Sequence, residues 1–174
     1  MPSRPKGPHG PAFLDLELAP WVLITELYWM TWKLLERRLY ALEVSGSQAR
    51  VLATLHFANE PIKPSAIAIL LFQETQSITG ILHRIESRGW VTRTPDAEDH
   101  RAVNLELTPA GSKVAQQIAR VSKDLYEELF SPALTANERR QLEAALRKLR
   151  TRGFQLPETD FRLRRAQQFQ AWSG

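Results

Sequence analysis

The apolar pattern of the chain changes its period at Gly89, and this change limits the folds that the sequence can adopt. Before the glycine, apolar residues recur at helical spacing in Ile78, Ile81, Leu82 and Ile85. After it, residues 90–94 are rich in β-forming side chains, and residues 103–107 alternate apolar with polar positions. A polar turn over residues 95–100 separates the two runs, so the segment predicts a helix followed by a β-hairpin.

Helix signals lie on both sides of this segment. Ser45 with Gln48, and Thr135 with Glu138, have the spacing of capping boxes, and Pro64 suits the first turn of a short helix over residues 65–72. The predicted helices span residues 20–44, 45–59, 65–72, 75–88, 109–130 and 136–152, with Gly153 as a stop and one further helix over 158–172. The predicted fold class is mainly α with a small β-hairpin.

The first predicted helix carries apolar residues on more than one face. Residues 21–44 contain no Gly or Pro, and Trp29, Leu34 and Leu42 fall outside its main apolar stripe. A second copy of the chain is one way to supply the extra partner surface. The predicted domains are a disordered basic arm (1–11), an N-terminal dimerisation helix (12–44), a winged helix-turn-helix DNA-binding domain (45–108) and C-terminal dimerisation helices (109–174).

The helix over residues 75–88 presents short, polar or cationic side chains opposite its apolar stripe. The candidate DNA contacts on this recognition helix are Thr75, Gln76, Ser77, Thr79, Gly80, His83 and Arg84. Such groups read base edges or hold phosphates, and Gly80 would allow a close approach to a groove. An ordinary amphipathic helix also has a polar outer face, but here the only carboxylate, Glu86, lies beside the apolar stripe. This absence of acid favours a nucleic-acid partner.

The hairpin loop mixes basic and acidic residues. The candidate DNA contacts of this wing are Arg93, Asp99, His100 and Arg101. Asp99 could orient Arg101 toward a narrow minor groove. The alternative is a solvated turn whose surface ion pair contributes little.

These residues together resemble the MarR family (multiple antibiotic resistance regulators). The resemblance lies in the segment 73–89, the run DAEDHRAV at 96–103 and the run LTPAG at 107–111, and it extends over about residues 21–152. It implies a homodimer with intertwined first and last helices, two wings flanking two major-groove helices, and repression or activation relieved by a small ligand. Three positions depart from residues frequent in the family: Lys63, Gly80 and His100.

The resemblance also implies an effector site between the dimerisation helices and the DNA-reading part. Its candidate lining residues are Trp21, Tyr28, Trp29, Trp32, His56 and Phe57. Aromatic lining would suit a planar aromatic or phenolic effector. The alternative is that each of these side chains is simply part of the core.

The amino-acid composition narrows the remaining functional classes of protein. The 174 residues carry a net charge of +4 and no cysteine, which favours an anionic partner and excludes disulfides and thiol sensing. The histidines lack metal-ligand spacing, and no catalytic arrangement stands out, so we predict no metal, no cofactor and no enzymatic activity. Glu26 and Lys33 interrupt the most apolar stretch, so we expect no membrane span and a cytoplasmic location.

Two functions remain after these exclusions. The first is a homodimeric, sequence-specific regulator of transcription that binds double-stranded DNA at a pseudo-palindromic operator. The alternative is a winged-helix dimer that acts as a protein-interaction module with weak or no specific DNA binding.

Overall fold

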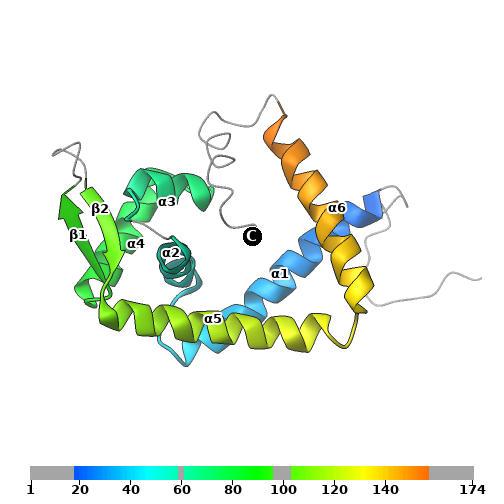
Figure 1. Cartoon of the computed structure of the whole chain (residues 1–174), viewed down its shortest axis with the longest axis horizontal. Helices are drawn as coiled ribbons and strands as arrows, with labels where there is room; N and C mark the ends of the chain where they lie inside the picture. The colour runs from blue at the N-terminus through cyan, green and yellow to red at the C-terminus, as the bar shows by residue number, and fades with distance from the viewer. Residues whose placement is uncertain (1–17, 59–60, 96–102, 157–174) are drawn as a thin grey trace, which may run out of the picture. The chain divides into compact units, whose positions relative to one another are not determined.

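A computed structural model describes residues 18–58, 61–95 and 103–156, and the chain forms two units, residues 1–34 and 35–174. The elements, shown in Figure 1, are α1 (Ala19–Tyr40), α2 (Gly46–Phe57), α3 (Pro64–Leu70), α4 (Thr75–Ser87), β1 (Val91–Pro95), β2 (Val103–Leu107), α5 (Pro109–Phe130) and α6 (Ala136–Phe154). Helix α1 passes from the first unit into the second. This is the mainly α fold with one antiparallel hairpin that the sequence predicted.

Local sequence signals account for several helix ends. The Ser45 hydroxyl accepts a hydrogen bond from the Gln48 backbone N–H at 3.2 Å, and the Gln48 side chain accepts one from the Ser45 N–H at 2.9 Å. Thr135 and Glu138 form the second capping box in the same way. Gly89 follows α4 with a φ of +69°, as expected for a helix-ending glycine. Both predicted capping boxes and the Gly89 stop are therefore confirmed.

Three predicted helix ends were wrong. Helix α3 ends at Leu70 rather than Phe72, because Phe72 adopts a φ of +54°. Helix α1 ends at Tyr40 rather than near Val44, because Glu43 adopts a φ of +54° and the chain turns to bury Val44, which is 4% exposed. Helix α6 continues through Gly153 to Phe154, because Gly153 does not adopt the positive φ that ends a helix at Gly89. The predicted arm (1–11) and the predicted last helix (158–172) lie outside the described residues.

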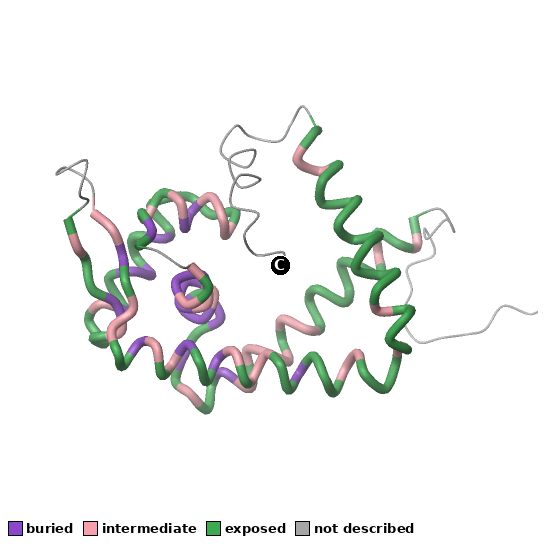
Figure 2. Tube along the Cα trace, viewed as in Figure 1, coloured by how far each residue is buried: buried purple, intermediate pink, exposed green. Residues whose placement is uncertain are grey.

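The hydrophobic core lies in the second unit, with α2 packed against α3, α4, α5 and β2 (Figure 1). Its completely or almost completely buried side chains are Leu39, Val51, Leu52, Ile67, Ile78, Leu82, Ile85 and Leu105. Every element of the unit except α6 contributes to this core. No residue of α6 is buried (Figure 2).

Within the described ranges, no single helix is long and apolar enough to cross a membrane. Helices α3 and α4 reach the required length and composition only as a pair, and they are bent by 114° with respect to each other. Their buried residues belong to the core described above.

Candidate nucleic-acid interface

Helix α4 has one fully packed face and one fully exposed face. Ile78, Ile81, Leu82 and Ile85 are all buried, which confirms the predicted apolar stripe. All seven predicted contacts on the other face are exposed to solvent. The stripe anchors α4 to the core, so the polar face is held outward on a rigid element.

Two neighbouring residues on the exposed face of α4, Thr79 and Gly80, differ in how the chain engages them. The Thr79 hydroxyl donates to the backbone carbonyl of Thr75 at 2.9 Å, so its lone pairs remain available as acceptors. A Cβ at Gly80 would meet no atom within 4 Å, so packing within the chain does not require glycine there. Glycine at this position lowers helix stability without relieving a steric contact.

The turn between α3 and α4 is stabilised from α2. Phe72 adopts a φ of +54°, and the Gln73 N–H donates to the carbonyl of Ala68 at 2.9 Å. The Arg50 side chain donates to the carbonyl of Leu71 at 2.8 Å and so satisfies a group at the end of α3. Sequence reasoning missed Arg50, whose partner lies 21 residues away.

Neither helix of the pair begins with a side-chain cap. Lys63 and Glu74 occupy the N-cap positions of α3 and α4, and neither makes a side-chain capping hydrogen bond. For Lys63 this agrees with the departure noted in the sequence. Uncapped N–H groups at the start of a recognition helix are suited to a phosphate.

The wing hairpin pairs Val91 with Leu107 at its base and Pro95 with Val103 at the far end. Ile62 adds an antiparallel bridge to Leu105, with backbone hydrogen bonds of 3.0 and 3.3 Å. The hairpin is therefore tied to the segment before α3. Three of the four predicted wing contacts lie outside the described residues: Asp99, His100 and Arg101.

Arg93, the remaining predicted wing contact, is engaged within the chain. Its Nε and Nη2 donate to the two carboxylate oxygens of Glu86, the Nη2 bond measuring 3.1 Å. The hydrogen bonds to Glu86 raise the pKa of Arg93 above its ordinary value, although burial opposes the shift. This bidentate pair joins the wing to the recognition helix, and it gives Glu86 a role that its position in the sequence did not reveal.

The LTPAG run has a structural role at the start of α5. The Thr108 hydroxyl donates to the carbonyl of Gly89 at 2.7 Å and accepts from the Gly111 N–H at 3.0 Å. A Cβ at Gly111 would lie 1.8 Å from the carbonyl oxygen of Trp90, so glycine is required for this close approach. The motif thus connects α5 to the residues that directly follow the recognition helix.

The six aromatic residues predicted to line an effector site fall into two groups. Tyr28 stacks on Trp32 with ring centroids 6.4 Å apart and meets Trp29 edge-on at 5.3 Å, within the first unit. Trp21, also in the first unit, is 71% exposed. His56 and Phe57 form an edge-on pair in the second unit. The effector site stays a prediction.

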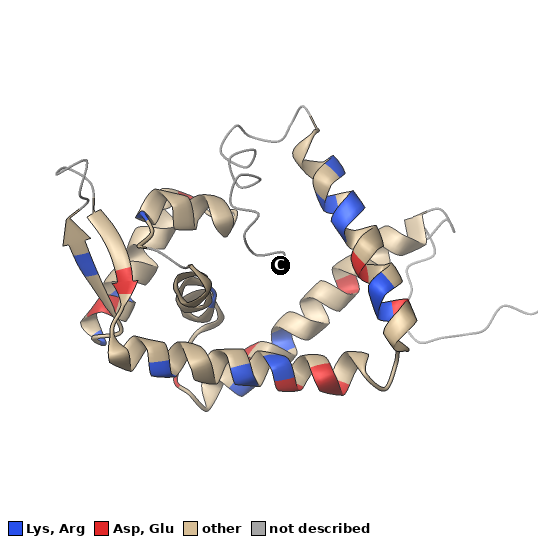
Figure 3. Ribbon diagram, in the orientation of Figure 1, with Lys and Arg blue, Asp and Glu red and all other residues tan. Residues whose placement is uncertain are grey.

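A cleft of about 570 Å³ lies between α5 and α6. Tyr126 and Phe130 stack on its α5 side with ring centroids 4.8 Å apart. Its α6 side combines leucines with Glu143 and with arginines that recur along this helix (Figure 3). Sequence reasoning singled out none of these residues, because an apolar stripe on an amphipathic helix normally indicates a core face.

The bent pair of helices, the exposed polar face of α4 and the tied hairpin define a winged helix-turn-helix protein of the DNA-binding class. A model of the MarR family matches residues 42–102. The multiple antibiotic resistance protein MarR of Salmonella typhimurium is 33% identical over 118 residues, which cover 67% of this chain and 81% of that protein. The transcriptional repressor MprA of Escherichia coli is 32% identical over 136 residues, covering 75% of this chain and 77% of MprA.

The solved structures agree with these relatives. A mutant MarR from Escherichia coli, crystallised with operator DNA, superimposes with a TM-score of 0.68 at 31% identity. The match covers 79% of this chain and 99% of that one. The chain belongs to the MarR family, whose members are transcription regulators rather than enzymes.

Proposed function

We propose that this protein is a homodimeric, ligand-responsive regulator of transcription that binds a pseudo-palindromic operator. The observation that carries the proposal is helix α4, whose four apolar residues are buried while its acid-free polar face is exposed. In a helix-turn-helix protein, such a face enters the major groove and reads base edges. A two-fold dimer would present two such helices to half-sites about one helical turn apart.

Discrimination between bases falls on the first two turns of α4. Gln76 would pair with an adenine edge, and Ser77 and Thr79 would contact bases or phosphates. Arg84, whose guanidinium makes no ion pair with the described residues, would anchor the helix on guanine or phosphate. Arg101 in the wing would supply a second anchor. Arg93 would act indirectly, because Glu86 already engages the Nε–Nη2 edge of its guanidinium.

The proposed dimer uses apolar side chains that are exposed in the described part of the chain. On α6 these are Leu142, Leu146 and Leu149, which lie on one face and are 38%, 43% and 57% exposed. On α1, Trp21, Ile24 and Tyr28 are between 41% and 71% exposed. Exposed apolar patches of this kind are typical of protein–protein interfaces.

The ligand response rests on the aromatic residues of α1 and α2 and on the family resemblance. A planar aromatic or phenolic effector would stack on rings such as Tyr28 and Trp32. We propose repression as the sign of regulation because MprA is named a transcriptional repressor. As a regulator of this kind, the protein would act in the cytoplasm.

Selection of bound duplexes from a random pool at low salt tests the proposal. We expect one enriched pseudo-palindrome whose affinity falls steeply with salt, because several phosphate contacts release counterions. Recovery of no enriched duplex would refute sequence-specific binding. Asymmetric enriched sites with a single half-site would refute the two-fold arrangement.

The engagement of Arg93 by Glu86 favours one alternative, a winged-helix module that binds a protein instead of DNA. It leaves Arg84 and Arg101 as the main candidate anchors. Replacing both with alanine separates the two functions: operator affinity should fall by on the order of a hundredfold for a DNA reader. An unchanged affinity would support the interaction module.

A further inference from the structure

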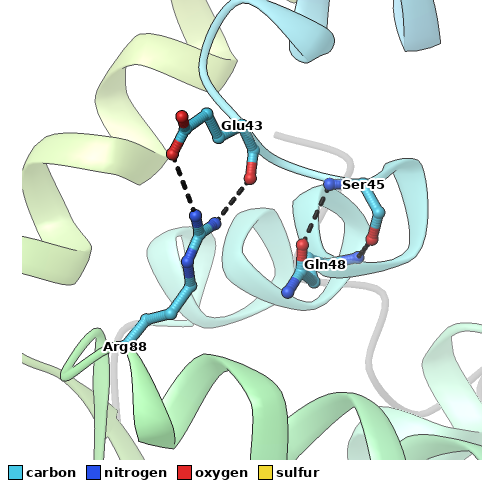
Figure 4. Close-up of polar contacts among 4 residues, drawn as sticks. All are labelled: Glu43, Ser45, Gln48 and Arg88. Atoms are coloured by element: carbon cyan, nitrogen blue, oxygen red, sulfur yellow. Dashed lines mark hydrogen bonds and ion pairs between the residues drawn. The ribbon is translucent and has the colours of Figure 1, made fainter.

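Arg88 is the first residue after α4, and its side chain makes three contacts. Its Nη1 donates to the backbone carbonyl of Glu43 at 2.5 Å, and its Nη2 donates to the Glu43 carboxylate at 3.2 Å (Figure 4). Its guanidinium carbon also lies 4.3 Å from the ring centroid of Trp90, within cation–π range. The side chain thus connects the end of the recognition helix to a turn 45 residues earlier.

The turn that Arg88 reaches is itself well defined. Glu43 has a φ of +54°, and its N–H donates to the carbonyl of Tyr40 at 3.0 Å. Val44 is 4% exposed and donates to the carbonyl of Leu39 at 3.3 Å. The Ser45 capping box then begins α2 directly, as Figure 4 shows. The Glu43 carbonyl is therefore an acceptor held in a fixed position at the corner between α1 and α2.

The backbone acceptor carries most of this contact. The Glu43 side chain is 84% exposed, so its ion pair with Arg88 is screened by solvent and contributes little. The planar, forked guanidinium lets one side chain donate to the carbonyl and stack on Trp90 at the same time. A lysine would keep the positive charge at the helix end, where the helix dipole favours a cation, but it would lose the fork.

Two other ties hold the same end of α4. The Glu86–Arg93 pair joins it to β1, and the hydrogen bond from Thr108 to Gly89 joins its end to α5. Among the described residues, Arg88 supplies the tie to the segment that directly follows α1. We propose that Arg88 is a positioning residue for operator binding, which sets the pose of the recognition helix relative to the α1–α2 corner. This inference rests on the proposed function.

The test compares Arg88→Lys with the matched control Glu43→Gln in the full-length chain. Arg88→Lys should lower affinity for the selected operator about tenfold. Its affinity for a non-specific duplex should change less than about twofold, because the phosphate contacts and the net charge are kept. Amide hydrogen exchange of residues 42–44 in the DNA-free protein should become faster. Glu43→Gln, which keeps the backbone carbonyl, should match the wild type in all three measurements.

Each outcome decides the proposal. Wild-type operator affinity in Arg88→Lys would overturn it, since charge at the helix end would then suffice. Equal losses for operator and non-specific duplex would also overturn it, because a general loss of folded protein lowers both. A wild-type chain that binds no duplex would refute the proposed function instead, and unchanged exchange at residues 42–44 in Arg88→Lys would then separately refute the tie.

Discussion

Helices α4 and α6 are stabilised differently: α4 by packing against the core, and α6 by its N-terminal cap. Helix α4 has 13 residues and buries four of them in the core, although its N-cap residue makes no side-chain capping bond. Helix α6 has 19 residues and a complete capping box, but it buries none. Capping and propensity can therefore form a helix that the core does not hold. The core of this chain therefore positions α4, whereas the position of α6 is left to the proposed dimer.

Removing the apolar stripe of α6 should have the largest effect, a loss of affinity between the two copies of the proposed dimer. Changing Leu142, Leu146 and Leu149 together to Gln should weaken the proposed dimer by about 5 kcal/mol, more than a thousandfold in Kd. Sedimentation over a range of concentrations measures the shift to monomer. Ala144→Gln, on the opposite face of α6, is the matched control. A triple variant that stays dimeric would place the interface elsewhere.

Truncation of a buried side chain in α4 tests how much the core contributes to the stability of this helix. Leu82 is 1% exposed, so Leu82→Ala should lower the free energy of unfolding by about 2–5 kcal/mol through lost burial and a residual cavity. Denaturant titration gives the value. Leu146→Ala, measured at a concentration where the protein is monomeric, serves as the comparison and should cost far less. Similar losses for the two variants would remove the distinction between the helices.

Substitutions at two glycines compare a position in a packed contact, Gly111, with a position on an exposed helix face, Gly80. Gly111→Ala should destabilise the fold by about 1–3 kcal/mol, because its Cβ would overlap the Trp90 carbonyl. Gly80→Ala should instead stabilise α4 by up to about 1 kcal/mol and yet weaken operator binding. Thermal unfolding and DNA titration separate these effects. Full operator affinity in Gly80→Ala would contradict a close approach at that position.

Loss of the Ser45 cap and loss of the Thr135 cap should have different effects. Ser45→Ala and Thr135→Ala each remove a cap worth about 1 kcal/mol. Because α2 lies in the core and α6 does not, Ser45→Ala should lower global stability, whereas Thr135→Ala in the monomer should speed amide exchange within α6 alone. Global destabilisation by Thr135→Ala would show that α6 folds cooperatively with the core.

The smallest expected effect concerns the ion pair that joins the last part of α1 to α5. Arg38 donates to Glu128 at 3.1 and 2.6 Å and lowers the pKa of that carboxyl below its ordinary value of 4.5. A lowered folded pKa means that the contribution is present above 4.5 and is lost as the pH falls through the folded value. The difference in Tm between the wild type and Glu128→Gln should therefore be small near neutral pH and vanish in acid. A difference that grows in acid would contradict the assignment.

Much of the structure of α4 and the wing hairpin could be predicted, because the sequence signals for these elements are local. The stripe from Ile78 to Ile85 follows from helical period alone, and the stop at Gly89 follows from the cost of a positive φ in other residues. The hairpin follows from alternation in β2. The end of α1 could not be predicted in this way, because Glu43 is a residue that seldom adopts a left-handed backbone.

The order of the elements, the buried face of α4 and the polar face opposite it follow from local sequence patterns, since each depends on residues within a few positions of one another. Which charges are engaged becomes clear only in the folded chain. Arg93 pairs with Glu86, and Arg88 with Glu43, across 7 and 45 residues. Such pairings depend on how distant segments pack in space, which no local period encodes. The same holds for α6, whose apolar stripe predicts a buried face, although no residue of this helix is buried against the described part of the chain.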